Sequence, residues 1–309
     1  MTADRRAQLA ANLDEVRGRI SRACSAAGRD PATVTLVAIT KTYPASDVQL
    51  LAELGVTDVG ENKDQEAAAK AAAVQAPLRW HFVGQLQRNK AKSVVRYADV
   101  VESVDSVRLV AALSKAAVAH RTSPLDVLIQ VSLDGDPSRG GAIASAAAAS
   151  ALSPGSSGAA PDSPSPPGGS RSAAAPAGIS RSAPSSLPSA FSVPSVSVSS
   201  RSAPIPASSD ISGFPEAPDG ERDLSRVAEA VAGADGLRLA GVMAVAPIGW
   251  DPDRAFANLA TLAARLRDRY PGATAVSAGM SGDLEAAIRH GATHVRIGTS
   301  LLGMRNTLR

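Results

Sequence analysis

Lys41 stands at the end of a short apolar run, residues 34–39, which has the pattern of a buried strand. A lysine placed directly after such a strand points into the mouth of a barrel, where desolvation disfavours the ammonium form. A neutral amine is what imine formation with an aldehyde requires. The alternative is a lysine on the rim, whose amine reaches solvent along its aliphatic stem. Position alone gives these two interpretations equal weight.

Two glycine-containing turns, residues 277–282 and 296–300, follow the last two predicted strands. Each combines glycine, which allows close backbone approach, with hydroxyl side chains and the start of a helix. Free backbone N–H groups at such starts bind phosphate, and barrel enzymes often form a phosphate site from the loops after strands seven and eight. Either turn alone is also an ordinary helix cap, whereas the two together indicate a bound phosphate monoester.

Arg296 is a charged residue inside the last predicted strand, where a charge is costly unless it has a partner. One interpretation is a salt bridge with a buried Asp or Glu. The other sets Arg296 against an acceptor atom of a ligand. An imine-forming lysine, a phosphate site and an inward arginine together suggest pyridoxal 5′-phosphate (PLP), whose ring nitrogen also needs a partner. An arginine would leave that nitrogen unprotonated, which makes the ring a weaker electron sink.

The elements that must position these residues alternate between short β-branched runs and amphipathic helical patterns. An opening helix places Leu9, Leu13, Val16 and Ile20 on one face and ends near Gly28. Predicted strands are residues 34–39, 57–60, 80–84, 98–101, 125–133, 239–246, 274–278 and 293–298, and predicted helices are residues 46–54, 63–74, 89–97, 107–120, 224–232, 254–269 and 283–290. This alternation predicts an α/β fold with a single closed (β/α)8 TIM barrel. No G-x-G-x-x-G follows a strand, so a dinucleotide-binding sheet is not favoured.

A block of 78 residues, 142–219, interrupts this pattern after the fifth predicted strand, and Ser, Ala, Pro and Gly make up 60 of them. Such a sequence buries too little apolar surface to offset the entropy of ordering it. We therefore expect a disordered insertion in a barrel formed by residues 1–141 and 220–309. Loops after barrel strands emerge on the face that carries the site, so one interpretation is a mobile lid. The simpler interpretation is a passive insertion, because long loops close at low entropic cost.

Six motifs resemble those of the pyridoxal phosphate homeostasis proteins, and the resemblance covers nearly the whole chain outside the 142–219 block. The motifs are residues 38–42 (Ala-Ile-Thr-Lys-Thr), 60–62 (Gly-Glu-Asn), 80–84 with 87 and 89–90, 241–243 (Gly-Val-Met), 277–283, and 295–299 (Val-Arg-Ile-Gly-Thr). The resemblance implies a barrel like the N-terminal domain of alanine racemases, with PLP as cofactor. The cofactor-binding residues that it implies are Lys41, Asn62, Ser277, Gly279, Met280, Arg296, Gly298 and Thr299.

The same resemblance implies a role for several of these residues. Lys41 would hold PLP as a Schiff base, with Asn62 near the ring and Arg296 facing the pyridine nitrogen. Ser277 and the turn at residues 298–299 would bind the phosphate. One departure concerns Arg139, which precedes paired glycines where relatives usually have a lysine. Arginine forms no imine, so a second, transfer-type lysine role is not expected there.

Composition excludes several classes of protein. The chain has no apolar run of about 18 residues, as a membrane span requires, and its charged opening segment is unlike a signal peptide. The single cysteine, Cys24, excludes a disulfide framework, and we expect it to pack as a small apolar residue. A net charge of +3 with 3% aromatic residues argues against nucleic-acid binding. We expect a cytoplasmic protein without membrane or nucleic-acid partners.

The histidines and two acidic residues are weaker candidates. His81 lies in a predicted strand and is expected to be a hydrogen-bonded structural residue. His290 and His294 flank a glycine and do not share a helix face, so no metal site is expected. Glu61 and Asp283 are the acidic residues expected near the barrel mouth. Asp283 stands at a helix start, where the helix dipole favours a carboxylate without any catalytic role.

The expected function is to hold PLP reversibly in intracellular PLP homeostasis, without turnover, with PLP-dependent apo-enzymes as possible recipients. The first alternative is an alanine-type racemase, which needs Lys41 on one face of PLP and usually a tyrosine on the other. Racemases take that tyrosine from a second domain of a partner subunit. The chain stops at Arg309 without such a domain, so we expect a monomer without racemase activity. The second alternative, a Schiff-base aldolase, needs an acid/base partner that the sequence does not identify.

Overall fold

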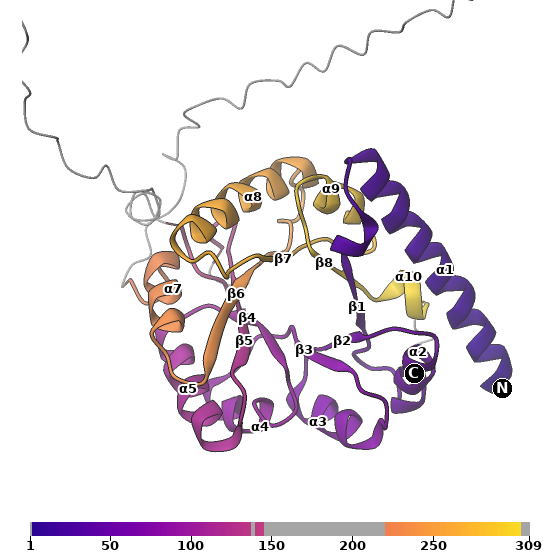
Figure 1. Ribbon diagram of the computed structural model, residues 1–309, viewed down its shortest axis with the longest axis horizontal. Coiled ribbons are helices and arrows are strands. Elements are labelled where there is room, and N and C mark those ends of the chain that lie inside the picture. Colours follow the sequence, from indigo (N-terminus) through magenta and orange to yellow (C-terminus); the bar gives the residue numbers. More distant parts are fainter. Residues whose placement is uncertain (1, 137–139, 145–219, 304–309) are drawn as a thin grey trace, which may run out of the picture. The chain divides into compact units, whose positions relative to one another are not determined.

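Eight short parallel strands close into a barrel in the computed structural model, which describes residues 2–136, 140–144 and 220–303 (Figure 1). Neighbours in the barrel follow chain order, and β8 pairs with β1 to complete the ring. The strands are β1 (Thr35–Ile39), β2 (Asp58–Glu61), β3 (Arg79–Phe82), β4 (Val100–Val104), β5 (Leu125–Gln130), β6 (Leu237–Met243), β7 (Ala275–Ser277) and β8 (His294–Ile297). The predicted (β/α)8 barrel, like that of the alanine racemase N-terminal domain, is confirmed.

The helices form the outer ring around the strands (Figure 1). They are α1 (Thr2–Ala26), α2 (Ala45–Glu53), α3 (Asp64–Ala73), α4 (Ala91–Val94), α5 (Val107–His120), α7 (Leu224–Ala232), α8 (Pro252–Arg269), α9 (Leu284–Arg289) and α10 (Thr299–Leu302), with 3-10 turns η1 (Pro31–Thr33) and η2 (Arg88–Lys90). Local sequence signals determine where several helices begin. The Asp223 carboxylate accepts hydrogen bonds from two backbone N–H groups at the start of α7, and Asp251 followed by Pro252 begins α8.

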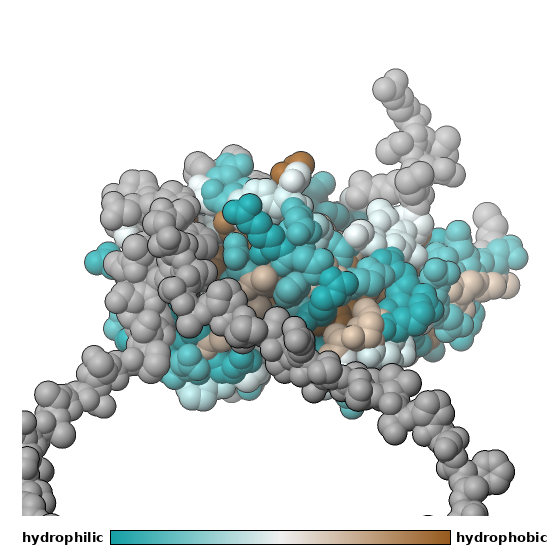
Figure 2. Space-filling model, turned by 90° about the horizontal axis from the view of Figure 1, so that it is seen from above, coloured by the Kyte–Doolittle hydropathy of each residue, from teal (hydrophilic) through white to brown (hydrophobic). Residues whose placement is uncertain are grey.

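The apolar core lies between the strands and this helical ring. One large cluster packs α5, α7 and α8 against β3 to β7, with Phe82, Leu113 and Phe256 among its members. A second cluster lies under α1, whose predicted apolar face, Leu9 to Ile20, is buried together with Cys24. The side of the molecule seen in Figure 2 is mainly hydrophilic where it is coloured, and the exposed large apolar side chains include Val118 and Ile248. Within the described residues, no helix has the length and apolar character needed to cross a membrane.

The barrel extends slightly into the block that we expected to be disordered. Ala142, Ile143 and Ala144 are buried, and backbone bridges join Val131 to Ala142 and Ile143 to Asp223. These three residues therefore belong to the core, because they continue past β5 in parallel with their neighbours. The remainder of the predicted insertion, residues 145–219, and also Arg139 lie outside the described residues.

The predicted helix at residues 89–97 is shorter than expected. The chain forms η2, then the single turn of α4, and residues 95–97 form a further turn that leads into β4. The predicted strand at residues 125–133 ends at Gln130, after which Val131 forms an isolated bridge and donates its backbone N–H to Met243. The other predicted elements match observed strands and helices to within a few residues.

Candidate cofactor site

Lys41 is the second residue after β1, at the carboxyl end of the barrel strands, as predicted. Its side chain is partly buried, and within the described part of the chain its amine makes no hydrogen bond or ion pair. The flanking residues differ sharply, since Thr40 is fully buried whereas Thr42 is exposed. Lys41 therefore presents a free amine from a well-anchored piece of backbone.

Asn62 stands beside Lys41 because it follows the neighbouring strand. Ile39 pairs with Gly60 across β1 and β2, so the chain reaches Lys41 and Asn62 two residues further along each strand. A close backbone contact holds Asn62, since a Cβ added at Gly84 would lie only 2.2 Å from the Asn62 carbonyl oxygen. The Oδ1 atom of Asn62 is buried without a hydrogen-bond partner. A ligand donor at this position would satisfy it.

The two predicted phosphate-binding turns do lie together. The hydroxyl of Thr299 donates to Ser281 Oγ, and the backbone N–H of Ser300 donates to the same oxygen, both at 3.3 Å. Gly279 also accepts a backbone bond from Arg296, which ties the turn after β7 to β8. Ser281, which our sequence analysis did not single out within residues 277–282, is therefore the serine that joins the turns.

Gly279 and Met280 shape the first of these turns. Gly279 has a φ of 88°, and a Cβ there would lie 2.6 Å from Ala287 Cβ, so only glycine is accommodated. The backbone N–H of Met280 donates to Asp283 Oδ1 at 2.6 Å. Asp283 thus has a local structural role, as expected for an acidic residue at a helix start. Gly298 lies against Ile39 of β1, which brings the second turn next to the strand that leads to Lys41.

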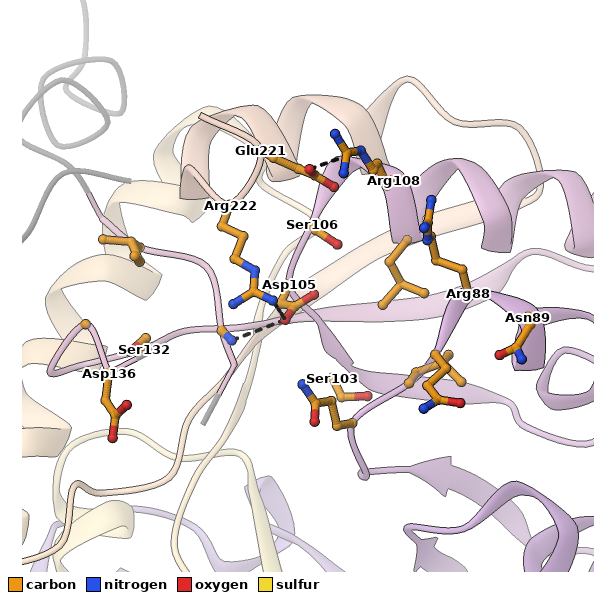
Figure 3. A pocket seen from close by; sticks show the side chains of 17 residues that line it. Arg88, Asn89, Ser103, Asp105, Ser106, Arg108, Ser132, Asp136, Glu221 and Arg222 are labelled. Carbon is orange, nitrogen blue, oxygen red and sulfur yellow. Dashed lines mark hydrogen bonds and ion pairs between the residues drawn. The ribbon is translucent and has the colours of Figure 1, made fainter. Parts of the chain in front are cut away.

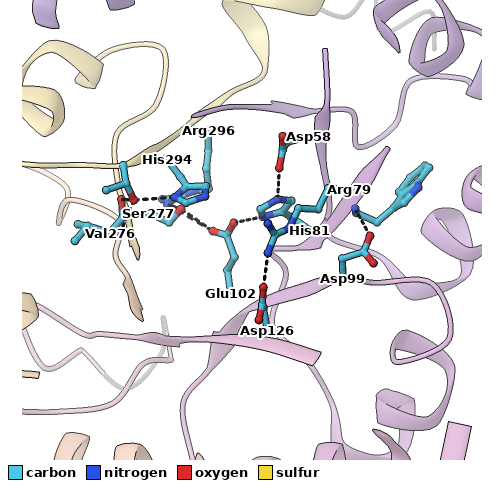
Figure 4. Close-up of polar contacts among 12 residues, drawn as sticks. Asp58, Arg79, His81, Asp99, Glu102, Asp126, Val276, Ser277, His294 and Arg296 are labelled. Carbon is cyan, nitrogen blue, oxygen red and sulfur yellow. Dashed lines mark hydrogen bonds and ion pairs between the residues drawn. The ribbon is translucent and has the colours of Figure 1, made fainter. Parts of the chain in front are cut away.

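Ser277 contacts other side chains of the barrel interior, and its role in phosphate binding stays a prediction. Its side chain is fully buried, and its hydroxyl donates to Glu102 Oε2 at 2.7 Å while it accepts from Arg296 at 2.8 Å. Glu102 lies on β4 and Ser277 on β7, so the two side chains meet across the barrel interior (Figure 4). The Ser277 hydroxyl therefore links Glu102 and Arg296 inside the barrel.

Arg296 points into the same interior. Its guanidinium donates to Ser277 Oγ and to the carbonyl of Ala244, both at 2.8 Å, and lies 3.9 Å from Glu102. Burial lowers the pKa of Arg296, and the Glu102 carboxylate opposes that shift. The interpretation of Arg296 as the partner of a buried Glu is thus confirmed. Its Nε atom makes no hydrogen bond to the described residues and remains available to an acceptor.

A chain of buried charges continues from Glu102. His81 bonds Glu102 at 2.6 Å through Nδ1 and Asp58 at 3.0 Å through Nε2 (Figure 4). Although burial disfavours a charged imidazole, the two carboxylates raise the pKa of His81 to about 9. Burial likewise opposes ionisation of Glu102, but the His81 bond and Arg296 lower its pKa to about 2. His81 is a hydrogen-bonded structural residue, as the sequence predicted, and it is charged at neutral pH.

Two cavities lie at this end of the barrel. One, of about 1030 Å³, is lined by residues after β3, β4 and β5, including Arg88, Ser106 and Arg222 (Figure 3). Two of its arginines are paired: Arg222 lies 3.7 Å from Asp105, and Arg108 pairs with Glu221. None of the predicted cofactor residues lines this cavity. Asn62 lines the second one, of about 580 Å³.

Glu102 and Lys70 are buried charged residues that our sequence analysis missed. Glu102 stands in the apolar run Val-Val-Glu-Ser-Val, and a charge inside a strand is the same signal that identified Arg296. Lys70 gave no comparable signal, since a lysine on a helix is normally exposed. In the structure it is buried and bonds Thr40 and Glu61.

Comparison with known proteins agrees with the observed fold. The family described as "Alanine racemase, N-terminal domain" matches residues 8–154. The pyridoxal phosphate homeostasis protein of Mycobacterium tuberculosis H37Rv is 35% identical over 98% of this chain and 95% of its own. PipY of Synechococcus elongatus PCC7942, solved with PLP bound, has a TM-score of 0.60 at 24% identity, covering 96% of this chain and all of its own. Alanine racemase of Clostridium difficile 630 has a TM-score of 0.58 at 10% identity, covering 97% of this chain but 58% of its own.

The fold and the site define a barrel of the alanine racemase N-terminal type with a free lysine at its mouth. The extent and level of identity with the mycobacterial relative are more specific than the fold alone. The chain belongs to the pyridoxal phosphate homeostasis protein family.

Proposed function

We propose that this chain binds PLP as a Schiff base on Lys41 and takes part in PLP homeostasis without catalytic turnover. The observation that carries the proposal is the Lys41 amine, which is free of hydrogen bonds and ion pairs among the described residues. It follows β1, whose neighbours β2 and β8 lead to Asn62 and carry Arg296. The names of the relatives and the PLP-bound neighbour PipY support the same ligand.

The residues present suit the three parts of PLP. Its aldehyde would meet Lys41, and the turns joined by Ser281 would hold its phosphate with Gly279, Gly298 and Thr299. The unbonded Nε of Arg296 would face the ring nitrogen. The buried Oδ1 of Asn62, which has no hydrogen-bond partner, would accept a hydrogen bond from a donor of the ligand. PLP supplies a reactive carbonyl, and the protein supplies the amine, the phosphate contacts and a cation that keeps the ring nitrogen unprotonated.

The absence of turnover is supported by the tyrosines. Racemisation needs a second base across the ring from Lys41. The chain has three tyrosines, and each is engaged or buried away from such a role: Tyr43 donates to the carbonyl of Gly303 at 2.7 Å, and Tyr270 accepts from Arg269. Burial raises the pKa of Tyr97, which disfavours it as a base. The state of these tyrosines supports a function without racemase turnover.

The decisive experiment traps the PLP adduct with borohydride and maps the labelled lysine by mass spectrometry. We expect the label on Lys41, loss of the imine absorption band in Lys41→Ala, and an unchanged band in Lys115→Ala, which removes an exposed lysine of α5. A label on any other lysine would contradict the proposal. Measurable racemisation of alanine by the PLP-loaded protein would contradict the absence of turnover.

The proposal extends to the setting in which the protein acts. We infer a cytoplasmic protein that passes PLP to PLP-dependent apo-enzymes. Incubation of the loaded protein with an excess of an apo-enzyme tests this, because transfer would move the imine band into the apo-enzyme's own spectrum. Loss of PLP from this chain no faster than into buffer would argue against direct transfer.

A further inference from the structure

Thr42, the residue after Lys41, has a backbone conformation that is unfavourable for its type. Its φ is 71°, and among the described residues it is the one non-glycine residue with a positive φ. A β-branched side chain is especially disfavoured there because its Cβ crowds the backbone. Such strained conformations persist only where the surrounding structure holds them, and they gather at functional sites.

Three side chains hold the backbone on both sides of Lys41. On one side, Lys70 Nζ donates to the carbonyl of Thr40 at 2.8 Å, and the Thr40 hydroxyl donates to Glu61 Oε1 at 2.6 Å. On the other side, the backbone N–H of Thr42 donates to Glu66 Oε1 at 2.5 Å. Lys41 is the single residue between these two anchors.

Lys70 joins the anchors into one unit. Its ammonium lies 2.8 Å from Glu61 Oε1 and 3.0 Å from Glu66 Oε1. We name Glu61, Glu66 and Lys70 the Lys70 clamp. Glu61 ends β2, and the other two residues stand one helical turn apart on α3, so the clamp connects two elements of the barrel to the Lys41 turn.

Two of the three side chains of the clamp are buried, and buried charges are costly unless they are paired and hydrogen-bonded. The side chains of Lys70 and Glu61 are 7% and 0% exposed. A buried ion pair contributes little net stability compared with apolar side chains of similar size. Burial opposes the charge on Glu66, but its bonds from Lys70 and the Thr42 N–H lower its pKa, so it is a carboxylate at neutral pH. Its negative charge is therefore available to hold the Thr42 N–H.

We propose that the Lys70 clamp positions Lys41 for imine formation by holding the strained turn at Thr42. The proposal rests on the proposed function, because it assigns these residues to the same lysine. Because the backbone at Lys41 is already ordered, imine formation does not have to pay the entropic cost of ordering it. Preorganisation of this kind strengthens binding. In this proposal Glu61, Glu66 and Lys70 act through Lys41, so they are positioning residues.

Glu66 offers the sharpest test, because its side chain is only partly buried and we therefore expect its variants to fold. Glu66→Ala removes the acceptor for Thr42, and we expect PLP binding to weaken by roughly tenfold, as for loss of a charged hydrogen bond. Glu66→Gln keeps an acceptor oxygen and should recover most of that loss. Glu53→Ala, which breaks the exposed ion pair between Glu53 of α2 and Arg6 of α1, is the matched control and should bind PLP as the unmodified chain does.

Thr42→Gly separates positioning from general stabilisation. Glycine adopts a φ of 71° without strain. We therefore expect Thr42→Gly, added to Glu66→Ala, to recover part of the lost affinity for PLP. If the clamp merely joined β2 to α3, the glycine would recover nothing, and that result would overturn the proposal. So would a Glu66→Ala variant that binds PLP as tightly as the Glu53→Ala control.

Hydrogen exchange in the PLP-free protein gives a readout independent of the ligand. The amide of Thr42 should be protected in the unmodified chain and exchange faster in Glu66→Ala, with no change in Glu53→Ala. Equal exchange in all three would contradict the clamp. Adduct mapping distinguishes the two proposals. A protected Thr42 amide with the borohydride label on another lysine would refute the proposed function, and the clamp would then only stabilise the turn at Thr42.

Discussion

Arg296 and Glu102 lie 3.9 Å apart inside the barrel, and the Ser277 hydroxyl bridges them by accepting from the guanidinium and donating to the carboxylate. The two charges come from β8 and β4, on opposite sides of the ring. Glu102 also bonds His81, so one carboxylate balances two buried cations. Contacts between charged side chains therefore hold the barrel interior around Arg296, the residue that would face a ligand.

Glu102→Gln should destabilise the protein strongly. The substitution keeps the size of the side chain but removes the negative charge that Arg296 and His81 share. Removal of one partner from a buried pair costs about 3 kcal/mol or more, because the remaining charge is left without compensation. Urea unfolding measures the loss as a lower free energy of unfolding.

Glu285→Gln is the control for that experiment. Glu285 pairs with Arg19 at 2.8 Å, but its side chain is 45% exposed. Solvent screens such a pair, so the expected loss is below about 1 kcal/mol. If Glu102→Gln lost no more than this control, the interior network would not be held together by charge.

His81 should make stability fall as the pH rises above neutrality. Its pKa is 6.5 in the unfolded chain and about 9 in the folded protein. A raised pKa contributes stability that is fully present below pH 6.5 and is lost as the pH rises through 9. Across this window the free energy of unfolding should drop by about 3 kcal/mol, as proton linkage requires.

The measurement compares the unmodified chain with His81→Gln from pH 6 to pH 10. The variant cannot take up the proton, so its stability should depend much less on pH in this range. Other groups that titrate there, such as Cys24, whose pKa burial raises, are common to both chains and cancel in the difference. Parallel pH profiles would show that His81 is not protonated in the folded state.

The sequence predicted the barrel well because its signals are local. Each strand is a short apolar run, each outer helix has its own amphipathic period, and the parallel order follows from the alternation. Lys41 was placed correctly for the same reason, since the end of a strand defines the mouth of a barrel. Arg296 was recognised as buried because it interrupts an apolar run.

The partners of the buried residues could not be predicted in this way. Glu102 meets Ser277 and Arg296 only because the sheet closes, and closure determines which strands face one another. The family resemblance assigned Ser277 to the phosphate site, and it did not indicate that the hydroxyl at the end of β7 bonds Glu102. The conformation of Thr42 has no signature in its own sequence, since contacts from β2 and α3 hold it.

Serine variants should distinguish the phosphate turns from the interior network. Ser281→Ala removes the oxygen that joins the turns after β7 and β8. We expect PLP binding to weaken about fivefold, near the value of one hydrogen bond, while binding of pyridoxal, which lacks the phosphate, stays unchanged. Competition titrations with the two aldehydes measure this selectivity.

Ser277→Ala is the counterpart of that experiment. The Ser277 hydroxyl touches Arg296 and Glu102, and it takes no part in joining the turns. Its loss should weaken PLP and pyridoxal binding to a similar degree, because both share the ring that Arg296 would face. A Ser277→Ala variant that lost affinity for PLP alone would restore the role in phosphate binding expected from the sequence.

Gly279→Ala should destabilise the turn after β7. The backbone there has a φ of 88°, and the new Cβ would lie 2.6 Å from Ala287 Cβ and 3.1 Å from Leu284 Cα. The strain and the close contacts with α9 together cost about 2 kcal/mol or more. Chemical unfolding measures this loss, and weaker PLP binding should accompany it, because the turn would shift away from Thr299.

Gly282→Ala provides a control from the same turn. An added Cβ at Gly282 meets nothing within 4 Å, and Gly282 does not have a positive φ. Its stability should stay within about 0.5 kcal/mol of the unmodified chain, as for ordinary surface substitutions. Equal losses in Gly279→Ala and Gly282→Ala would mean that the turn adapts to a side chain at either position, and the close packing of Gly279 against α9 would then not be what shapes the site.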